Sequence, residues 1–169
     1  MSNTISKLIK TMELEPHPEG GYFKQTYAAE DHFTVPKQYE GSTRPAATHI
    51  YYLLDGEDYS SWHRIKSDEI WHFYAGSTLS LHILNTDGFL ETIKLGNGIT
   101  EHNAVFHYCV PKELWFAASV DDKDSYSLLG CTVSPGFDYR DWELADNETL
   151  LKQFPQHRDI INQHRVRGS

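Results

Sequence analysis

The sequence predicts a single all-β domain, a sandwich or barrel built from short strands. Aromatic residues make up 13% of the 169 residues, and many of them lie in short runs that alternate with polar residues, as strands with one buried face require. Turn signals separate these runs about every 8–12 residues, the spacing typical of sandwiches and barrels. The segment 78–85, TLSLHILN, shows the alternation most clearly, because apolar Leu79, Leu81 and Ile83 share one face.

The chain begins with a predicted helix and a first strand. Apolar residues recur at helical spacing over 5–12, and Pro16 and Pro18 end that helix. The segment 20–29, GGYFKQTYAA, follows a glycine turn and has the composition of a strand. The stretch 30–45 is polar, so we expect a long loop there.

Most of the predicted strands follow that loop, and the C-terminal part of the chain is predicted to be helical. The strands are 47–54, 59–65, 69–75, 78–85, 89–95, 103–110, 114–120 and 125–135, which gives about nine or ten in all. Leu150, Leu151 and Phe154 lie at helical spacing, and Pro155 interrupts the helix before it resumes. We expect residues 1–169 to form one domain, with a barrel core over about 20–142 and a helical segment over about 146–164.

The composition excludes several classes of function. The net charge is −9 and no basic stripe is present, so nothing in the sequence would pair with the phosphates of a nucleic acid. No apolar run approaches the roughly 18 residues of a membrane span, and the N-terminus lacks the apolar core of a signal peptide. Cys109 and Cys131 each lie in an apolar strand-like run, which is typical of buried thiols in a reducing compartment. We expect a cytoplasmic protein that binds neither nucleic acid nor membrane.

The segment 60–76, SSWHRIKSDEIWHFYAG, carries the candidate site. His63 and Glu69 lie on either side of the turn KSD, so they could meet on one face of a strand pair. Imidazole nitrogen and carboxylate oxygen are the ligands of many zinc, iron and manganese sites. Ile65, the next position on that face, is apolar, and two ligands do not make a metal site. We therefore expect no metal cofactor; if a divalent metal is bound, His63 and Glu69 would hold it.

Neighbouring positions would complete a pocket. Strand alternation places Trp71 and Phe73 on the face of Glu69, where aromatic side chains would form apolar walls. The glycine pair in HPEGGYF allows the backbone to approach a ligand closely. The further candidates for ligand binding are Glu19, Tyr22 and Lys24 in that segment, with Thr48, Tyr52 and Ser61 as neutral hydrogen-bonding groups. For each of these residues the alternative is a structural role in the core, in a turn or on the surface.

Four segments, in the same order along the chain, resemble the cupin_5 group of the cupin superfamily, also called DUF985. They are LEPHPEGGYFKQTY, THIYYLL, SSWHRIKSDEIWHFYAG and VPKELWFAA. The group belongs to the RmlC-like jelly rolls and has no settled activity. The resemblance implies a cupin double-stranded β-helix, which is a jelly-roll barrel, with short N- and C-terminal helices. It also implies that the protein pairs as a homodimer.

The cupin motifs account for the candidate site and for its departures. His63, Glu69 and Gly76 match the first histidine, the glutamate and the closing glycine of the first motif. Ile65 stands at the second histidine, and Phe116 stands at the histidine that closes the second motif. The resemblance therefore implies a pocket that lacks half of the usual cupin metal ligands.

The segment GGYFKQTY is also similar to the RGxFxExF segment of dTDP-sugar 3,5-epimerases. Those enzymes are metal-free cupins that use a histidine base and a tyrosine acid. This resemblance implies His63 as a candidate base, with Tyr52 or Tyr74 as a candidate acid. Gly20 and Gly21 stand where the epimerases have the arginine that holds the nucleotide diphosphate, so the sequence departs from that pattern.

The leading hypothesis is a protein that binds a small polar molecule, such as a sugar or nucleotide derivative, inside the barrel. Proton abstraction next to a carbonyl, as in sugar epimerisation or isomerisation, is the metal-free chemistry that fits these residues. One alternative is a metal-dependent cupin enzyme such as a dioxygenase. Another is a small-molecule-binding module without turnover, so whether the protein is an enzyme stays open.

Overall fold

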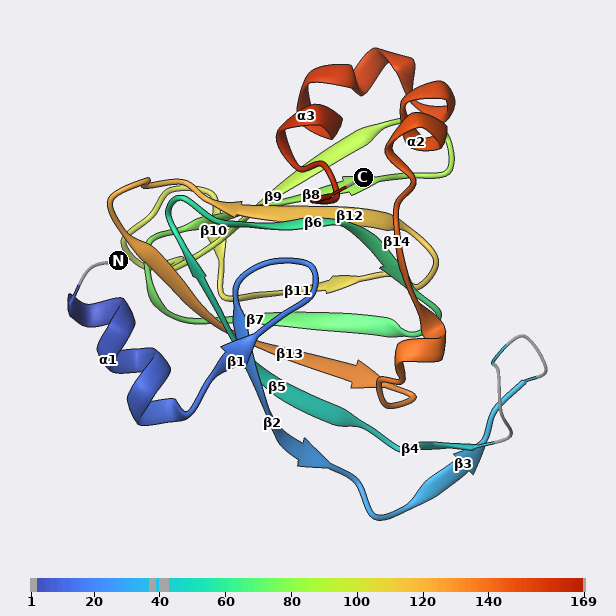
Figure 1. Cartoon of the computed structure of the whole chain (residues 1–169), viewed down its shortest axis with the longest axis horizontal. Helices are drawn as coiled ribbons and strands as arrows, with labels where there is room; N and C mark the ends of the chain where they lie inside the picture. Colours follow the sequence, from blue (N-terminus) through green and yellow to red (C-terminus); the bar gives the residue numbers. More distant parts are fainter. Residues whose placement is uncertain (1–2, 37–38, 40–42, 169) are drawn as a thin grey trace.

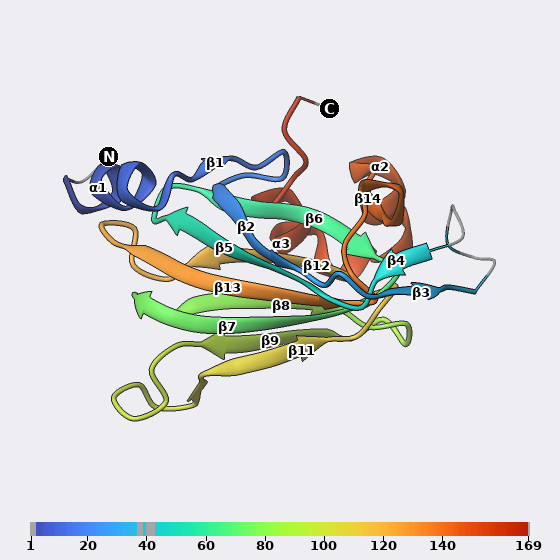
Figure 2. The same ribbon diagram turned by 90° about the horizontal axis from the view of Figure 1, so that it is seen from below.

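The computed structural model describes residues 3–36, 39 and 43–168. Over this part of the chain, two six-stranded sheets face each other (Figures 1 and 2). The first has the order β1 (Glu15–Pro16), β2 (Tyr22–Ala28), β5 (Thr48–Asp55), β13 (Tyr126–Ser134), β7 (Asp68–Gly76) and β11 (His107–Val110). The second has the order β10 (Ala104–Val105), β9 (Leu90–Leu95), β8 (Leu79–Leu84), β12 (Trp115–Val120), β6 (Tyr59–Ile65) and β14 (Trp142–Leu144).

Strands that are far apart in the sequence are neighbours in both sheets. β5 pairs antiparallel with β13, β6 with β12, and β7 with β11. This nesting arises when one long hairpin rolls up, so that β5, β6, β7 and β8 fall alternately in the first and the second sheet. The arrangement is a jelly roll, as the resemblance to the cupin_5 group implies.

The expected loop over 30–45 contains a short hairpin. Its two strands are β3 (His32–Thr34) and β4 (Thr43–Pro45), which pair antiparallel beside the main sheets. Residues 37–38 and 40–42 of that prediction lie outside the described residues. The prediction of a continuous loop is therefore wrong at both ends of the segment.

The hairpin is fixed by a contact that no local pattern reveals. Arg44 on β4 is buried, and its guanidinium donates to both carboxylate oxygens of Asp141, at 2.6 and 2.9 Å. The two residues lie 97 positions apart in the sequence.

The segment 103–110, predicted as one strand, forms two short strands instead. They are β10 and β11, which belong to different sheets.

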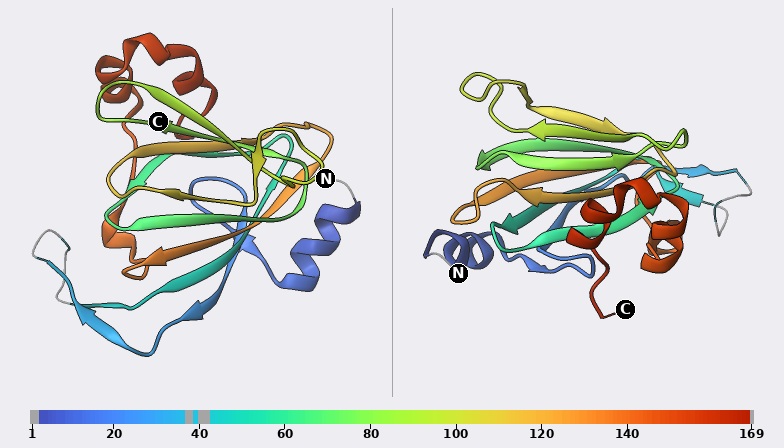
Figure 3. Two further views of the ribbon diagram at one scale, coloured as in Figure 1. Left: turned by 180° about the vertical axis from the view of Figure 1, so that it is seen from behind. Right: turned by 90° about the horizontal axis from the view of Figure 1, so that it is seen from above.

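Helices cover the outer faces of the two sheets, as expected from the apolar spacing near each end of the chain. They are α1 (Asn3–Met12), α2 (Asn147–Gln153) and α3 (Arg158–Gln163), with short 3-10 helices at Tyr139–Asp141 and Pro155–His157. α1 lies on the first sheet, where Ile5 packs with Leu53, and α2 and α3 lie on the second, where Phe154 packs with Trp62 (Figure 3). Among the described residues, no helix has the length and hydropathy needed to cross a membrane.

The interior between the sheets has an apolar end and a polar end. Leu54, Leu81 and Leu129 belong to the fully buried apolar core. Thr48 near the start of β5 and Glu69 near the start of β7 both stand opposite Val133 of β13. This register brings polar side chains from separate strands to the same end of the barrel.

Candidate functional site

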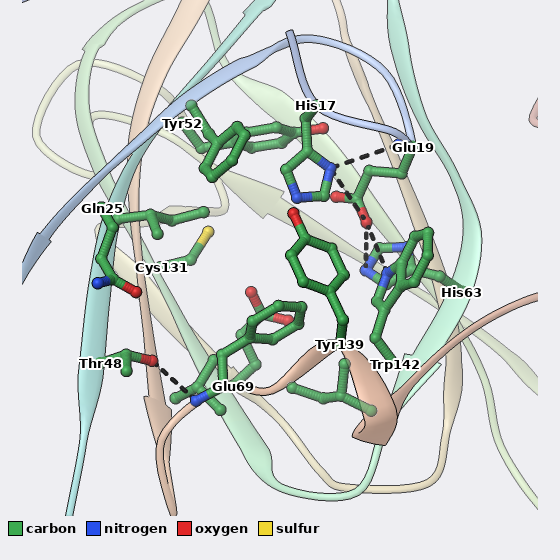
Figure 4. A pocket seen from close by; sticks show the side chains of 15 residues that line it. His17, Glu19, Gln25, Thr48, Tyr52, His63, Glu69, Cys131, Tyr139 and Trp142 are labelled. Carbon is green, nitrogen blue, oxygen red and sulfur yellow. Dashed lines mark hydrogen bonds and ion pairs between the residues drawn. The ribbon is translucent and has the colours of Figure 1, made fainter. Parts of the chain in front are cut away.

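A cavity of about 130 Å³ opens at the polar end of the barrel (Figure 4). Its volume is close to that of an engineered cavity of ~150 Å³ that binds benzene, so a six-membered ring would fit. Apolar side chains, among them Phe23, Ile50 and Val133, form much of its wall. The polar groups gather on two sides, around Glu19 and around Glu69 (Figure 4).

The glycine pair of HPEGGYF brings Glu19 into the barrel. Gly20 and Gly21 have φ angles of +118° and +70°, which favour glycine. A side chain at Gly20 would collide with the carbonyl oxygen of Tyr59. The loop is also fastened to β6, because the backbone N–H of Ser61 donates to the carbonyl oxygen of Glu19 at 2.9 Å. The segment is thus both a tight turn and a wall of the cavity.

Glu19 and His63 form a buried ion pair. His63 Nδ1 donates to the carbonyl oxygen of Ser61 at 2.7 Å, and its Nε2 lies 3.2 Å from Glu19 Oε2. Both ring nitrogens therefore face oxygen atoms. Glu19 also accepts hydrogen bonds from Ser60 Oγ and Trp142 Nε1. Burial alone would raise the pKa of Glu19, but the charge of His63 and these hydrogen bonds hold it below its usual value.

The pKa of Glu69 is shifted in the opposite direction from that of Glu19. Burial, reinforced by the negative charge of Glu19, raises the pKa of Glu69 to about 8. Interactions with Cys131 and Trp71 favour its ionised form and only partly offset the shift. Trp71 Nε1 makes no well-formed hydrogen bond with any described residue. At neutral pH Glu69 is therefore a neutral acid in the same cavity as an ionised carboxylate.

The structure leaves the predicted base and acids poorly placed for those roles. His63 has no free lone pair directed into the cavity, because both ring nitrogens are engaged. Tyr52 lines the cavity, but its hydroxyl donates to the carbonyl oxygen of Gly20 at 2.7 Å, and burial raises its pKa well above the usual value. Tyr74 lies on the outer face of β7, where its hydroxyl contacts His49 Nε2 at 3.2 Å. Glu69 is the better placed group for proton transfer.

A β-bulge in the pairing of β6 with β12 decides which of two adjacent serines, Ser60 or Ser61, points into the barrel. The pairing shifts between Phe116 and Ala118, so Ser60 points inward to Glu19. Ser61, expected at the pocket, turns outward and contacts the carbonyl oxygen of Arg165. Thr48 lines the cavity as expected, and its hydroxyl accepts from the backbone N–H of Phe137 at 2.9 Å.

On β2 the side chains that point into the barrel are not the ones predicted from the sequence, Tyr22 and Lys24. Phe23 and Gln25 line the cavity. Tyr22 instead packs beneath α1, and Lys24 forms an ion pair with Glu13. Strand alternation is preserved, but the register of this strand depends on its pairing with β5.

Trp71 and Phe73 share the inner face of β7 with Glu69, as alternation predicts. Trp71 is fully buried in the apolar core, and Phe73 packs against that core. Neither residue lines the cavity, because both lie farther along the barrel from its polar end. They support the floor of the site rather than its walls.

Several residues of the site were not anticipated. His17 lines the cavity, and its Nδ1 accepts the backbone N–H of Glu19 at 3.3 Å. Burial lowers the pKa of His17, and the charge of Glu19 only partly offsets this, so the ring is neutral. Tyr139 and Trp142, which precede the C-terminal helices, also line the cavity. His17 lies in the glycine-pair motif, whereas Trp142 bonds to Glu19 across 123 positions and carries no local signal.

The two cysteines have different surroundings. Cys131 is buried on the inner face of β13, and burial raises the pKa of its thiol well above the usual value. Cys109 is exposed on β11, contrary to the expectation that both are buried. The edge position of β11 in its sheet explains the difference.

Comparison with known proteins places these features in context. Residues 6–145 match the family Cupin_5, described as cupin superfamily (DUF985). An uncharacterised protein of Saccharomyces cerevisiae is 27% identical over 160 residues, which cover 89% of this chain and 79% of the yeast protein.

Solved structures of similar proteins share the fold of this chain. A hypothetical protein from Leishmania major has a TM-score of 0.86 and 35% identity, covering 95% of this chain and 97% of that one. A protein from Shewanella oneidensis has the same TM-score and identity and covers 98% of both chains. Oxalate decarboxylase of Bacillus subtilis has a TM-score of 0.56 at 11% identity, with 89% of this chain matched to 37% of that one, and shows the cupin fold.

One of the oxalate decarboxylase structures is described by its Mn(II) centres. Among the described residues, no group of three or more histidine, cysteine, aspartate or glutamate side chains could hold one. Ile65 is apolar, and the ring of Phe116 lies 4.0 Å from that of His63. The nitrogens of His63 are already engaged, so this donor set does not fit a metal ion.

Proposed function

This chain belongs to the Cupin_5 family of the cupin superfamily (DUF985), and from that premise we propose that its barrel binds a small polar carbonyl compound and moves a proton on it. A sugar-like molecule is one member of this class, and metal-independent epimerisation or isomerisation is the reaction type. One observation carries the proposal: two buried carboxyl groups line one ring-sized cavity, Glu19 beside His63 with its pKa lowered, and Glu69 with its pKa raised to about 8. Such pairs are typical of sites that perform acid–base chemistry.

Glu69 is the proton acceptor in the proposed reaction. A raised pKa makes its carboxylate, once formed, a stronger base than an exposed glutamate, and a pKa near the working pH suits general acid–base catalysis. The C–H bond next to the carbonyl breaks, the proton moves to Glu69, and the electron pair moves to the carbonyl oxygen. Return of a proton to the opposite face of the same carbon restores the carbonyl and gives an epimer. In an α-hydroxy carbonyl compound, the enolate oxygen can instead gain a proton while the neighbouring hydroxyl loses one, and return of the carbon-bound proton to the former carbonyl carbon then gives the isomer.

His17 is the residue suited to hold the carbonyl oxygen. Because its Nδ1 accepts the N–H of Glu19, the proton of this neutral ring is on Nε2. The ring lies across the cavity from Glu69 and directs its second nitrogen inward (Figure 4). A neutral imidazole that donates to the carbonyl oxygen opposite a glutamate base is an established pattern in isomerases.

Deuterium incorporation tests the proposal. Ring-sized carbonyl compounds, charged and uncharged, would be incubated with the protein in D₂O, and exchange next to the carbonyl followed by NMR. We expect an exchange rate above that of buffer, rising with pH up to about 8 as Glu69 ionises. Glu69→Gln, which preserves the shape of the side chain, should lower the rate by ~10²-fold or more. Glu57→Gln, in an exposed loop, should leave it unchanged.

Two outcomes would count against this assignment. Exchange at the wild-type rate in Glu69→Gln would show that another group is the base. Binding without exchange for every compound would contradict the proton transfer and indicate a binding module.

A further inference from the structure

The charges around the cavity bear on the class of ligand. Among the described residues that line it, there is no lysine and no arginine. The imidazole of His63 already faces a carboxylate, because its Nε2 lies 3.2 Å from Glu19 Oε2. Burial keeps Tyr52 and Cys131 in their neutral forms. The cavity is therefore polar at two points and has no net positive charge.

The ion pair is not available to a charged ligand. His63 is buried between the carbonyl oxygen of Ser61 and the carboxylate of Glu19. Glu19 is held by three donors, from His63, Ser60 and Trp142. An anion that took His63 as its partner would leave Glu19 buried without its counter-charge, which costs several kcal/mol.

Arginines close in the sequence to residues that line the cavity already have carboxylate partners. Arg140 is paired with Asp138, Arg64 is paired with Glu143, and Arg44 donates through two nitrogens to Asp141. A phosphate or carboxylate in the cavity would therefore meet Glu19 and Glu69 without a partner of opposite charge. When Glu69 ionises, the repulsion of an anion increases further.

We infer that the cavity takes an uncharged carbonyl compound about one ring in size and excludes phosphorylated and carboxylated analogues. The inference rests on the proposed function and narrows its substrate class. The apolar walls at Phe23, Ile50 and Val133 suit the faces of the ring, and the polar groups suit one carbonyl oxygen and the hydrogen next to it. A phosphorylated nucleotide derivative, which the sequence leaves open, falls outside this class.

Three probes of the same ring size test the inference: cyclohexanone, cyclohexanecarboxylate and cyclohexylammonium. Binding to the intact protein would be measured by NMR titration at pH 7. We expect cyclohexanone to bind at least about tenfold more tightly than the carboxylate, since burial of an unpaired charge costs more than the roughly 1.4 kcal/mol that a factor of ten represents. The ammonium ion should also bind more weakly than the ketone, because Glu19 is already paired.

A charge added at the rim provides a matched control. Gln25→Lys places a cation at the cavity and should increase the affinity for cyclohexanecarboxylate. Thr26→Lys adds the same charge at the next residue, which is exposed and does not line the cavity, and should leave that affinity unchanged.

The outcomes separate this inference from the proposed function. Tighter binding of the carboxylate or of the ammonium ion by the wild-type protein would overturn the inference and leave the proposed function in place. Failure of all three rings to bind would overturn the proposed function, and the inference with it.

Discussion

Glu19 and Glu69 have the same side chain and line the same cavity, yet the protein holds them in opposite charge states. Both are buried, so desolvation raises the pKa of each. Glu19 has His63, Ser60 and Trp142 as partners, which together outweigh that cost. Glu69 has weaker partners and feels the charge of Glu19, so its pKa rises. The difference comes from the neighbours of each carboxyl group, with His63 beside Glu19 first among them, and not from the depth of burial.

The raised pKa of Glu69 makes the stability of the protein depend on pH. Between the usual value of 4.5 and about 8, the native state binds a proton that the unfolded state has lost, so the free energy of unfolding falls as pH rises through this window. Glu69→Gln removes this titration. Relative to wild type, the variant should gain stability from pH 5 to pH 8, by up to a few kcal/mol.

Urea denaturation at pH 5, 6.5 and 8 would measure this change. Glu57→Gln, on the exposed loop, is the control and should follow the wild-type curve. A constant difference between Glu69→Gln and wild type at all three pH values would show that Glu69 is ionised throughout.

At the scale of single elements, the C-terminal helices depend on histidines that they help to bury. His82 on β8 faces outward, and its ring centroid lies 5.0 Å from that of His164, which follows α3. His164 Nε2 contacts Ser119 Oγ on β12 at 3.0 Å, so it links the end of α3 to the sheet. Burial, with the nearby His164, lowers the pKa of His82 to about 4. Protonation of either ring is therefore disfavoured while the helices are docked.

Acid should consequently weaken the protein in a specific window. The unfolded state binds a proton at His82 below pH 6.5 and the native state only near pH 4, so stability is lost as pH falls between these values. His82→Gln should flatten this part of the profile, and His102→Gln, at an exposed position, should not. The measurement is the urea midpoint at pH 7, 5.5 and 4.5. Parallel profiles for His82→Gln and wild type would contradict the prediction.

For the molecule as a whole, the outer face of the first sheet is unusually rich in aromatic side chains. Tyr27 and Tyr74 are exposed, and the rings of His49, His72 and Tyr74 lie within about 6.5 Å of one another. β11 also leaves the edge of this sheet unpaired among the described strands. Exposed aromatic faces and open edges favour association with another chain.

We therefore keep the prediction of a homodimer. Light scattering at micromolar concentration should give twice the mass of one chain. The mass of a single chain under the same conditions would contradict it.

Local rules accounted for the architecture and for part of the site. Strand alternation and turn spacing predicted a sandwich or barrel, the resemblance to the cupin_5 group implied the jelly roll, and proline and apolar spacing predicted α1. The motif spacing selected His63 and Glu69, and the structure places both at the cavity with Glu19, Thr48 and Tyr52. The hairpin within 30–45 was not predicted, because the ion pair of Arg44 with Asp141 that holds it joins distant parts of the chain.

The sequence by itself determined that the chain is built from short strands with a helix near each end, because alternation and apolar spacing depend on neighbours a few residues away. The cupin motifs added that Ile65 and Phe116 stand where other cupins have metal ligands. Only the tertiary structure decided the chemistry of the pocket. The bulge turns Ser61 outward, and the contacts of Glu19 with Trp142 and His63 set the charge of the cavity. Ionisation depends on burial and on partners from other strands, and those are assembled when the sheets close around the cavity.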